Sequence, residues 1–299
     1  MSTATSPSTG KLYGIARVCK TWEMPRSSFY ERKTKPLEQP AHLKRGPRTT
    51  VNDEELLVLI RDDLAASPFI GEGHRKVWAR IRFVKGIKTG RKRVLRIMRE
   101  NSLLSPHRVV QGRPKEHKGT IITAAPDVMW GTDGTKIFTV EDGWCWLFTA
   151  VEHWNAECVG WHVSKTGDRF AALQPLSMAL TRRFGSVGAA AARGLILRMD
   201  NGSQYLSDHF QNQIKFWGIA PSFAFVSQPQ TNGVAERFYK TLKEQVIYGR
   251  TYRTIEEVRV AVAAFIELYN QHWLVEKLGF RSPKQASSDY YNEQLKAAA

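Results

Sequence analysis

Residues 128–139, which read VMWGTDGTKIFT, decide the fold of the C-terminal part of this chain. The run is apolar and rich in β-branched and aromatic residues, and the turn residues Glu141-Asp142-Gly143 follow it, so it predicts a β-strand that opens a hairpin. Asp133 lies in the middle of the run. A carboxylate in an apolar strand is costly unless it is exposed at an edge, paired or bound to a metal ion. The same stretch therefore predicts both a strand and a candidate site.

Further elements extend outward from this strand. Strand-like runs at 143–153 and 157–164 complete an antiparallel meander. The pattern then predicts a helix over 169–184, a strand over 194–200, a helix over 207–218, a strand over 221–226, and two helices over about 232–248 and 254–271. This order predicts an α/β fold, a mixed sheet flanked by helices, in which the first and fourth strands pair.

Charge divides the chain unevenly. Residues 1–120 hold 26 Lys/Arg against 11 Asp/Glu, whereas residues 121–299 hold 18 against 17. A basic segment joined to a near-neutral one predicts a polyanion-binding arm, although a ribosomal or merely solubilising basic surface is the alternative on charge alone. A hydrophobic content of 42% excludes wholesale disorder. The three cysteines show no metal-ligand spacing, and no apolar run is long enough to span a membrane.

The basic segment contains two predicted DNA-binding modules. Two short helices around Pro25 predict an N-terminal helix-turn-helix at 11–35, and a basic, proline-containing linker follows at 36–50. Three helices in residues 51–106 predict a second helix-turn-helix domain. In its middle helix we expect Val77, Ile81 and Val84 to share the apolar face.

The third helix of that domain has basic residues outside its apolar stripe. Such a helix suits insertion into the major groove with phosphates neutralised along its flanks. A solvated basic face is the alternative. We predict DNA contacts from Arg91, Lys92, Arg93, Arg96 and Arg99.

Two further acidic residues accompany Asp133. Asp200 ends the predicted fourth strand, and Glu236 lies near the start of a helix. If the first and fourth strands pair, the three carboxylates converge and need a cation, for which oxygen ligands favour Mg²⁺ or Mn²⁺. Two such ions stabilise the attacking and leaving oxygens of a phosphoryl displacement. Each acid considered alone has a simpler structural interpretation: Asp133 as a bulge residue, Asp200 as a turn former and Glu236 as a solvated residue in the first turn of a helix.

The sequence motifs around the three acids resemble those of a known family. Residues 130–135 resemble its W-x-x-D-x-T strand, residues 200–205 its D-N-G-x-x-[FY] turn, and residues 229–236 its P-x-x-x-G-x-x-E helix entry, with 35 residues between the last two acids. This is the DDE pattern of the retroviral-integrase superfamily. Over about residues 12–285 the chain is similar to its orfB-type bacterial insertion-sequence transposases, which carry a helix-turn-helix of the form seen in 71–104.

The resemblance implies an RNase H-like catalytic core at 127–285, between a linker at 107–126 and a C-terminal tail at 286–299. It implies that Asp133, Asp200 and Glu236 are catalytic and hold two Mg²⁺ (or Mn²⁺) ions, and that cleavage and strand transfer proceed without a covalent enzyme–DNA intermediate. It also implies DNA contacts from Asn232, Lys240 and Lys243. Helical spacing places both lysines on the face of Glu236, although a solvated helix face is the simpler interpretation of the lysines alone.

The expected partners are double-stranded DNA, namely the terminal repeats of an element and its target, and further copies of this chain on paired ends. Fusion or partnership with an upstream-frame protein is also expected from the family. The expected location is the bacterial cytoplasm, at the nucleoid, with no membrane association. Two alternatives remain open: a non-catalytic DNA-binding regulator that keeps the fold, and a general nuclease of RNase H topology.

Overall fold

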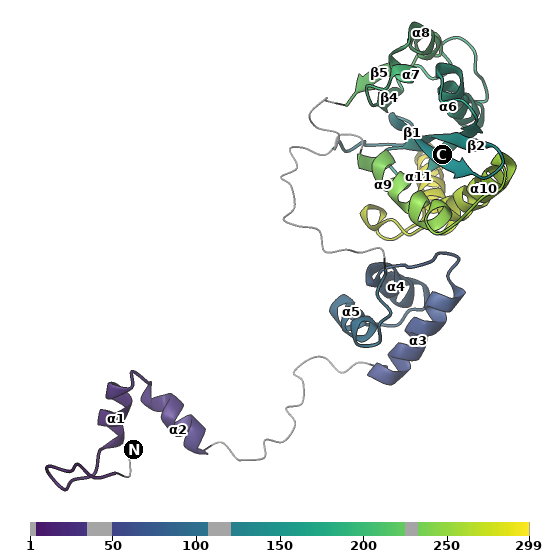
Figure 1. Ribbon diagram of the computed structural model, residues 1–299. Coiled ribbons are helices and arrows are strands. Elements are labelled where there is room, and N and C mark those ends of the chain that lie inside the picture. Colours follow the sequence, from purple (N-terminus) through teal and green to yellow (C-terminus); the bar gives the residue numbers. More distant parts are fainter. Residues whose placement is uncertain (1–3, 35–49, 107–120, 225–232, 299) are drawn as a thin grey trace. The chain divides into compact units, whose positions relative to one another are not determined.

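The computed structural model describes residues 4–34, 50–106, 121–224 and 233–298 (Figure 1). The chain divides into two compact units, residues 1–49 and residues 50–299. The first unit holds helices α1 (Ile15–Thr21) and α2 (Arg26–Thr34). Glu23 takes a positive φ of 48° between them, which turns the chain ahead of Pro25. The helix pair predicted at 11–35 is therefore present, and its role as a helix-turn-helix stays a prediction.

The second unit begins with three helices around a small core. Helix α3 (Asp53–Ala66) starts at a capping box, in which the Asn52 side chain accepts from the Glu55 amide at 2.8 Å and the Glu55 carboxylate accepts from the Asn52 amide at 3.0 Å. Helix α4 (His74–Ala79) continues into the π-helical turn η1 (Arg80–Val84), and α5 (Arg91–Glu100) follows. The apolar side chains that hold the helices together are Leu56, Ile60, Val77, Ile81, Val94, Ile97 and Met98.

The prediction that Val84 shares the apolar face of this middle helix is wrong. Val77 and Ile81 are fully buried, but Val84 is 75% exposed. The π-helical turn η1 is wider than an α-helical turn, so it rotates the last residue away from the face that α-helical spacing would give it.

After the three helices, the second unit contains a five-stranded sheet with the strand order β3-β2-β1-β4-β5. Strands β1, β2 and β3 pair antiparallel, whereas β4 pairs parallel to β1 and β5 parallel to β4. This confirms the predicted mixed sheet and the predicted pairing of the first and fourth strands. The strands are β1 (Met129–Thr139), β2 (Gly143–Glu152), β3 (Cys158–Ser164), β4 (Ile196–Met199) and β5 (Ala220–Phe223).

Helices cover both faces of the sheet, with α6–α8 on one side and α9–α11 on the other (Figure 1). Side chains from opposite faces of β2 show the division: Phe148 packs in the core under α6 and α8, and Leu147 in the core under α9 and α10. The first layer consists of α6 (Arg169–Phe184), α7 (Ser203–Leu206) and α8 (Asp208–Phe216). The second consists of α9 (Gly233–Leu242), η3 (Lys243–Ile247), α10 (Ile255–His272), η4 (Glu276–Leu278) and α11 (Pro283–Ala298).

Helix α11 crosses the domain boundary that the sequence predicted at residue 285. It is fastened to the turn after β2, because the Asn155 side chain donates to the Ser287 hydroxyl at 2.7 Å and to the Pro283 carbonyl at 3.1 Å. The segment predicted as a tail is thus part of the helical layer. Over the described ranges, no helix is long and apolar enough to cross a membrane.

Candidate active site

Helix α9 is fixed over the strand that carries Asp133. The Tyr239 hydroxyl lies within hydrogen-bonding distance of two carbonyl oxygens, that of Asp133 at 2.6 Å and that of Leu147 at 3.2 Å. Tyr239 follows Glu236 by three residues, so the two share a side of α9. The hydroxyl therefore holds the helix that carries Glu236 against β1.

The Asp133 carboxyl group has a raised pKa of about 6. Burial is the largest cause, and the negative charges of Asp200 and Glu236 add to it. The Gly134 amide, which donates to the carboxylate at 2.7 Å, and the charge of Lys243 act in the opposite direction. The sheet and α9 thus bring the three predicted acids close enough for Asp200 and Glu236 to alter the protonation of Asp133.

Asp200 directly follows β4 and shapes the turn that carries it. Its carboxylate accepts from the Gly202 amide at 2.9 Å, and the Asn201 side chain donates to the Ala224 carbonyl at 3.1 Å. The turn is therefore tied to the end of the β5 segment. Tyr205 lies fully buried beneath it, and its pKa is raised by burial and then by the charges of Asp133 and Asp200.

Glu236 lies exposed in the first turn of α9. Partial burial of its carboxyl group raises the pKa. An acidic residue suits this position because the helix N-terminus carries partial positive charge. Asn232, a predicted DNA contact just before this helix, lies outside the described residues.

The chemistry of the three acids fits hard divalent cations, although the three carboxylates do not form a compact group in this structure. Among the described side chains, none of these carboxylates forms an ion pair, and Lys243 is the cation that acts on Asp133. Oxygen donors with uncompensated negative charge are the ligands that Mg²⁺ and Mn²⁺ prefer. Yet no group of three or more Asp, Glu, His or Cys residues in the described ranges is gathered closely enough to hold an ion. Repulsion between like charges opposes their closer approach.

The predicted DNA-contact residues of α5 fall into two sets. Arg91 pairs with Glu276 at 3.3 Å, Arg93 pairs with Asp53 at 2.7 Å, and Arg96 pairs with Asp53 and Glu100. Lys92 and Arg99 are exposed, and neither forms an ion pair within the described ranges. Sequence spacing could not distinguish these sets, because Asp53 and Glu276 lie far away along the chain.

A cleft of about 850 Å³ separates the N-terminal end of α4 from α9. Arg75 and Lys76 line one side, and Arg237 and Lys240 line the other. The cleft carries both charges, because Arg75 pairs with Glu276 at 2.7 Å and Lys76 with Glu72 at 3.6 Å. The predicted contact residue Lys240 lines this cleft, whereas Lys243 is partly buried beside Asp133. Arg237 was not singled out in the sequence, because only the fold brings it opposite α4.

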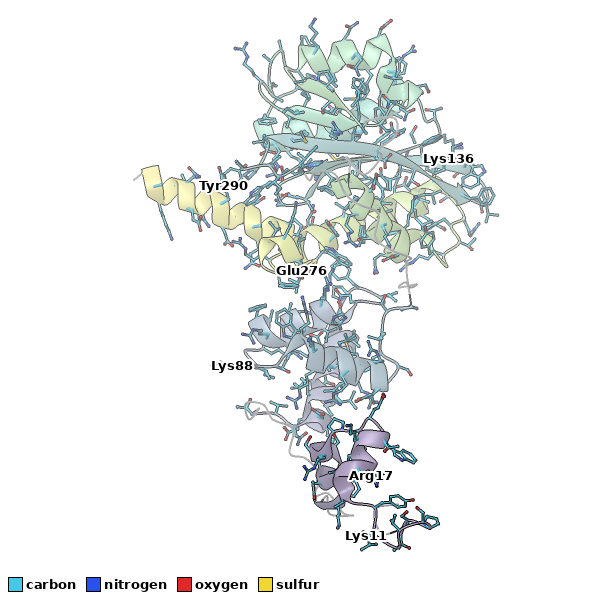
Figure 2. All side chains as sticks on the ribbon, turned by 90° about the vertical axis from the view of Figure 1, so that its left-hand side faces the viewer. Lys11, Arg17, Lys88, Lys136, Glu276 and Tyr290 are labelled. Atoms are coloured by element: carbon cyan, nitrogen blue, oxygen red, sulfur yellow. The ribbon has the colours of Figure 1, made fainter. Side chains whose placement is uncertain are left out.

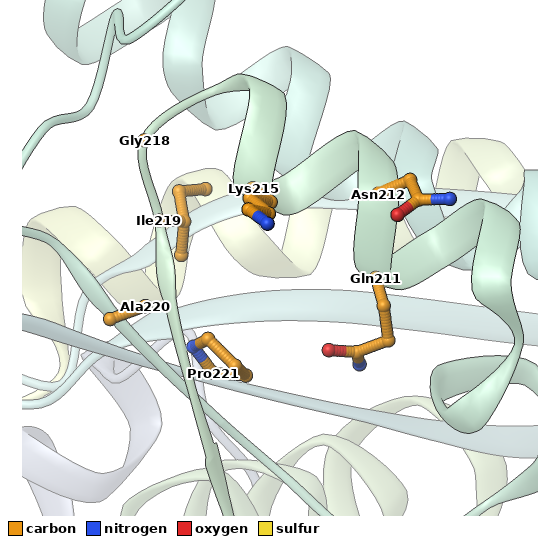
Figure 3. Close-up of a pocket in the computed structure, with 7 residues that line it drawn as sticks. All are labelled: Gln211, Asn212, Lys215, Gly218, Ile219, Ala220 and Pro221. Atoms are coloured by element: carbon orange, nitrogen blue, oxygen red, sulfur yellow. The ribbon is translucent and has the colours of Figure 1, made fainter.

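A second, shallower pocket of about 440 Å³ lies beside the β5 edge (Figure 3). Its polar side chains are Gln211, Asn212 and Lys215, and residues 218–221 complete the lining. None of the three candidate carboxylates lines it. The pocket is therefore separate from the candidate active site.

Comparisons with known proteins agree with this architecture. A family model described as Integrase core domain matches residues 123–229, a second model of the same description matches 217–283, and an HTH-like domain model matches 52–110. The chain is 25% identical over 289 residues to the transposase for insertion sequence element IS629 of Shigella sonnei, covering 93% of each protein. It is 28% identical over 242 residues to transposase InsD for the IS2 element of Escherichia coli, covering 78% of each.

Solved structures with a similar backbone come from retroviral integrases. The catalytic core domain of BIV integrase is 19% identical, with a TM-score of 0.41, and the match covers 56% of this chain and 99% of that one. The HTLV-2 integrase catalytic core domain in complex with magnesium is 16% identical, with a TM-score of 0.41 and coverage of 55% and 98%. The predicted family resemblance is confirmed by the domain models and the transposase relatives.

Proposed function

Because the chain combines an integrase core domain with an HTH-like domain, we propose that it is an insertion-sequence transposase that cuts and joins DNA through Asp133, Asp200 and Glu236. The observation that carries this proposal is the contact between the elements that bear the acids: the Tyr239 hydroxyl of the helix with Glu236 lies 2.6 Å from the backbone carbonyl oxygen of Asp133. Asp200 directly follows β4, which pairs parallel to the strand that carries Asp133. The raised pKa of Asp133, to which the charges of Asp200 and Glu236 contribute, agrees with this proposal.

In the proposed reaction, water attacks a phosphodiester at the end of the element. A new bond forms between phosphorus and the water oxygen, and the bond to the 3′ oxygen breaks, which leaves a 3′-hydroxyl. That hydroxyl then attacks a phosphodiester of a second strand and displaces its 3′ oxygen. Two divalent ions, when bound to the three carboxylates, would stabilise the attacking and leaving oxygens.

The side chains around the acids would position the DNA. Lys240 and Arg237 of α9 line the cleft beside α4 and form no ion pair with a described residue, so they suit backbone phosphates. Lys243 lies nearer the acids and offsets part of their charge. Tyr239 acts through the backbone, because it holds α9 against β1. Lys92 and Arg99 of α5, which are exposed and form no ion pair with a described residue, would contact the terminal repeat.

The remaining parts of the proposal concern assembly and place. Joining two element ends to one target requires paired ends, so we propose an oligomer of this chain on double-stranded DNA. A partner or fusion encoded in an upstream reading frame belongs to the same proposal. Acting on DNA, the protein would work in the bacterial cytoplasm at the nucleoid.

The test is a strand-transfer assay on the inverted repeats that flank the gene, with and without Mg²⁺. We expect the wild-type chain to be active only with the metal, and Asp200→Asn to abolish transfer while DNA binding persists. Asp208→Asn removes an exposed acid eight residues further on and should remain active. Transfer that survives Asp200→Asn contradicts the mechanism.

Two other outcomes would support the alternatives. Binding to the repeats without any transfer by the wild-type chain would identify a regulator. Cleavage without end preference in footprinting would identify a general nuclease.

A further inference from the structure

The β1–β2 hairpin carries a row of aromatic rings that leads from the core to an exposed tip. Phe148 is fully buried, Trp146 is partly buried and Trp144 is 60% exposed. These residues alternate along β2, so they lie on one face of the sheet. The rings of Trp146 and Phe148 stack almost parallel, with centroids 5.6 Å apart. The row of rings thus ends at Trp144, whose indole is largely uncovered by the described residues.

Strand β1 completes this face from the other side of the hairpin. Phe138 lies directly opposite Trp144, and the two rings meet edge to face at 5.4 Å. Lys136 lies opposite Trp146, with its ammonium group 4.9 Å from the ring centroid. Lys136, Phe138, Trp144 and Trp146 are called the hairpin face below. Figure 2 shows Lys136 toward the far end of the long strand.

The charge of the hairpin face is positive. Lys136 forms no ion pair with any carboxylate in the described ranges. The two acids of the hairpin turn are already engaged, since Asp142 pairs with Lys165 at 2.7 Å and Glu141 with Arg253 at 2.6 Å. An exposed pair of rings beside a cation that pairs with none of the described carboxylates has the chemistry of a nucleic-acid surface rather than of an acidic-peptide or lipid-tail site.

The face continues onto the start of α6. Gly167 lies directly against Trp146, where a Cβ atom would overlap the indole ring. Just beyond it, the Arg169 guanidinium lies 4.9 Å from the Phe170 ring centroid. Phe170 is 49% exposed and packs 4.6 Å from the His209 ring. A further ring, that of Phe170, and a second cation, Arg169, thus extend the surface past the hairpin.

The position of the hairpin face limits the kind of DNA that it can take. Asp133 and Lys136 belong to the same strand, about 10 Å apart along it, but their side chains point to opposite faces of the sheet. A strand that runs from the candidate active site to the hairpin face must bend sharply around the hairpin. Duplex DNA is stiff on this length scale, whereas an unpaired strand bends freely and exposes its bases for stacking.

We propose that the hairpin face binds an unpaired DNA strand beside the cleavage point, with bases stacked on Phe138 and Trp144 and a phosphate neutralised by Lys136. This inference rests on the proposed function, because it assumes that DNA is opened next to Asp133. Large apolar groups that remain exposed commonly mark interaction sites, and these rings combine with a cation that suits the DNA backbone.

The test measures binding of a fluorescent oligothymidylate to the full chain by anisotropy, in EDTA so that no metal-dependent chemistry occurs. We expect Phe138→Ala and Trp144→Ala each to weaken binding about tenfold. Lys136→Gln should lower the salt dependence by about 0.7 in the log–log slope, the contribution of one phosphate on a single strand. Phe216→Ala is the matched control, because Phe216 is as exposed as Phe138 but lies on α8, and it should bind normally.

Unchanged oligothymidylate binding in both ring variants, or no binding by the wild-type chain, overturns the inference. A second result would also overturn it: ring variants that keep their affinity for oligothymidylate but show a lower oligomeric mass in light scattering. That result would identify the hairpin face as a contact between copies of this chain. Strand transfer is measured separately in Mg²⁺. If the wild-type chain transfers strands but the ring variants bind oligothymidylate normally, only this inference is refuted. If binding depends on the rings but the wild-type chain transfers no strand, only the proposed function is refuted.

Discussion

The Tyr239 hydroxyl lies 2.6 Å from the backbone carbonyl oxygen of Asp133, and this contact joins the helix that carries Glu236 to the strand that carries Asp133. The same hydroxyl reaches the Leu147 carbonyl at 3.2 Å on the neighbouring strand. A single buried phenol thus fixes the distance between a helix and a hairpin at the candidate active site. Its contribution is structural and acts through the backbone.

Tyr239→Phe should therefore weaken both stability and activity. Loss of a buried hydrogen bond costs about 1–2 kcal/mol in the free energy of unfolding, and a less firmly held α9 should slow strand transfer. Urea unfolding and the strand-transfer rate measure the two effects. Tyr252→Phe is the control, because Tyr252 also donates to a buried carbonyl, that of Val246, away from the three acids. Equal loss of activity in both variants would show that the Asp133 contact has no special role.

Glu152→Gln should stabilise the protein above neutral pH. The Glu152 side chain is fully buried, and burial raises its pKa to about 7 against a usual 4.5. Because the folded-state pKa is raised, the stability contribution of this group is fully present below about pH 4.5 and is lost as pH rises through 7. The loss at pH 8 is on the order of 3 kcal/mol.

Urea unfolding at pH 6.5 and pH 8 checks this prediction. The stability of the wild-type chain should fall over this interval by more than that of Glu152→Gln. Below pH 6.5 a second buried group, His153, acts in the opposite direction, because burial lowers its pKa to about 4 and its contribution is lost as pH falls through that value. The exposed Glu54→Gln is the control. Parallel pH profiles for wild type and Glu152→Gln would contradict the prediction.

Asp53→Asn should increase DNA affinity. Hydrogen bonds from Arg96 and then Arg93 lower the pKa of Asp53, so this carboxylate neutralises two arginines that were predicted to contact DNA. Its removal leaves Arg93 without an ion pair and Arg96 paired with Glu100 alone, so more of their positive charge is available to phosphates. The slope of log affinity against log salt should steepen by about 0.9 for each phosphate gained on duplex DNA.

Anisotropy titrations at several salt concentrations measure this slope. Asp62→Asn removes an exposed acid from the same helix and controls for the change in net charge. An equal effect of the two substitutions would mean that the pairing of Asp53 does not restrain α5.

Gln245→Ala should loosen the HTH-like domain from the core. The Gln245 side chain accepts from the Ile70 amide at 2.9 Å and donates to the Ile70 carbonyl at 2.7 Å, next to Phe69, which is buried among core side chains of α9 and α10. Leaving these buried backbone groups without a hydrogen-bond partner lowers the free energy of unfolding by about 1–3 kcal/mol. Calorimetry should then separate one unfolding transition into two, whereas a single transition at an unchanged temperature would contradict this.

The sequence predicted the elements of the candidate site better than their contacts. Asp133, Asp200 and Glu236 lie in the predicted strand, strand end and helix start because local periodicity and turn residues determine those elements. Tyr239 was not singled out, since an aromatic residue on a helix gives no sign of the carbonyl that it will meet.

Other features depend on contacts that no local pattern contains. The π-helical turn that exposes Val84 has no periodicity of its own, and α11 is held in place by Asn155, far away in the chain. The division of the basic α5 residues into those with and those without an ion pair likewise depends on Asp53 and Glu276. Pairing of distant residues is decided by the tertiary fold and is invisible to spacing.

The hydrogen bond from the Asn201 side chain to the Ala224 carbonyl joins the Asp200 turn to the chain directly after β5. Asn201 adjoins Asp200, and β5 pairs parallel to β4, the strand that Asp200 follows. The Asp200 turn is therefore held from two strands, by its own backbone at the end of β4 and by this amide at the end of β5. A change at the end of β5 consequently alters the position of the Asp200 carboxylate, although no residue of β5 belongs to the three acids.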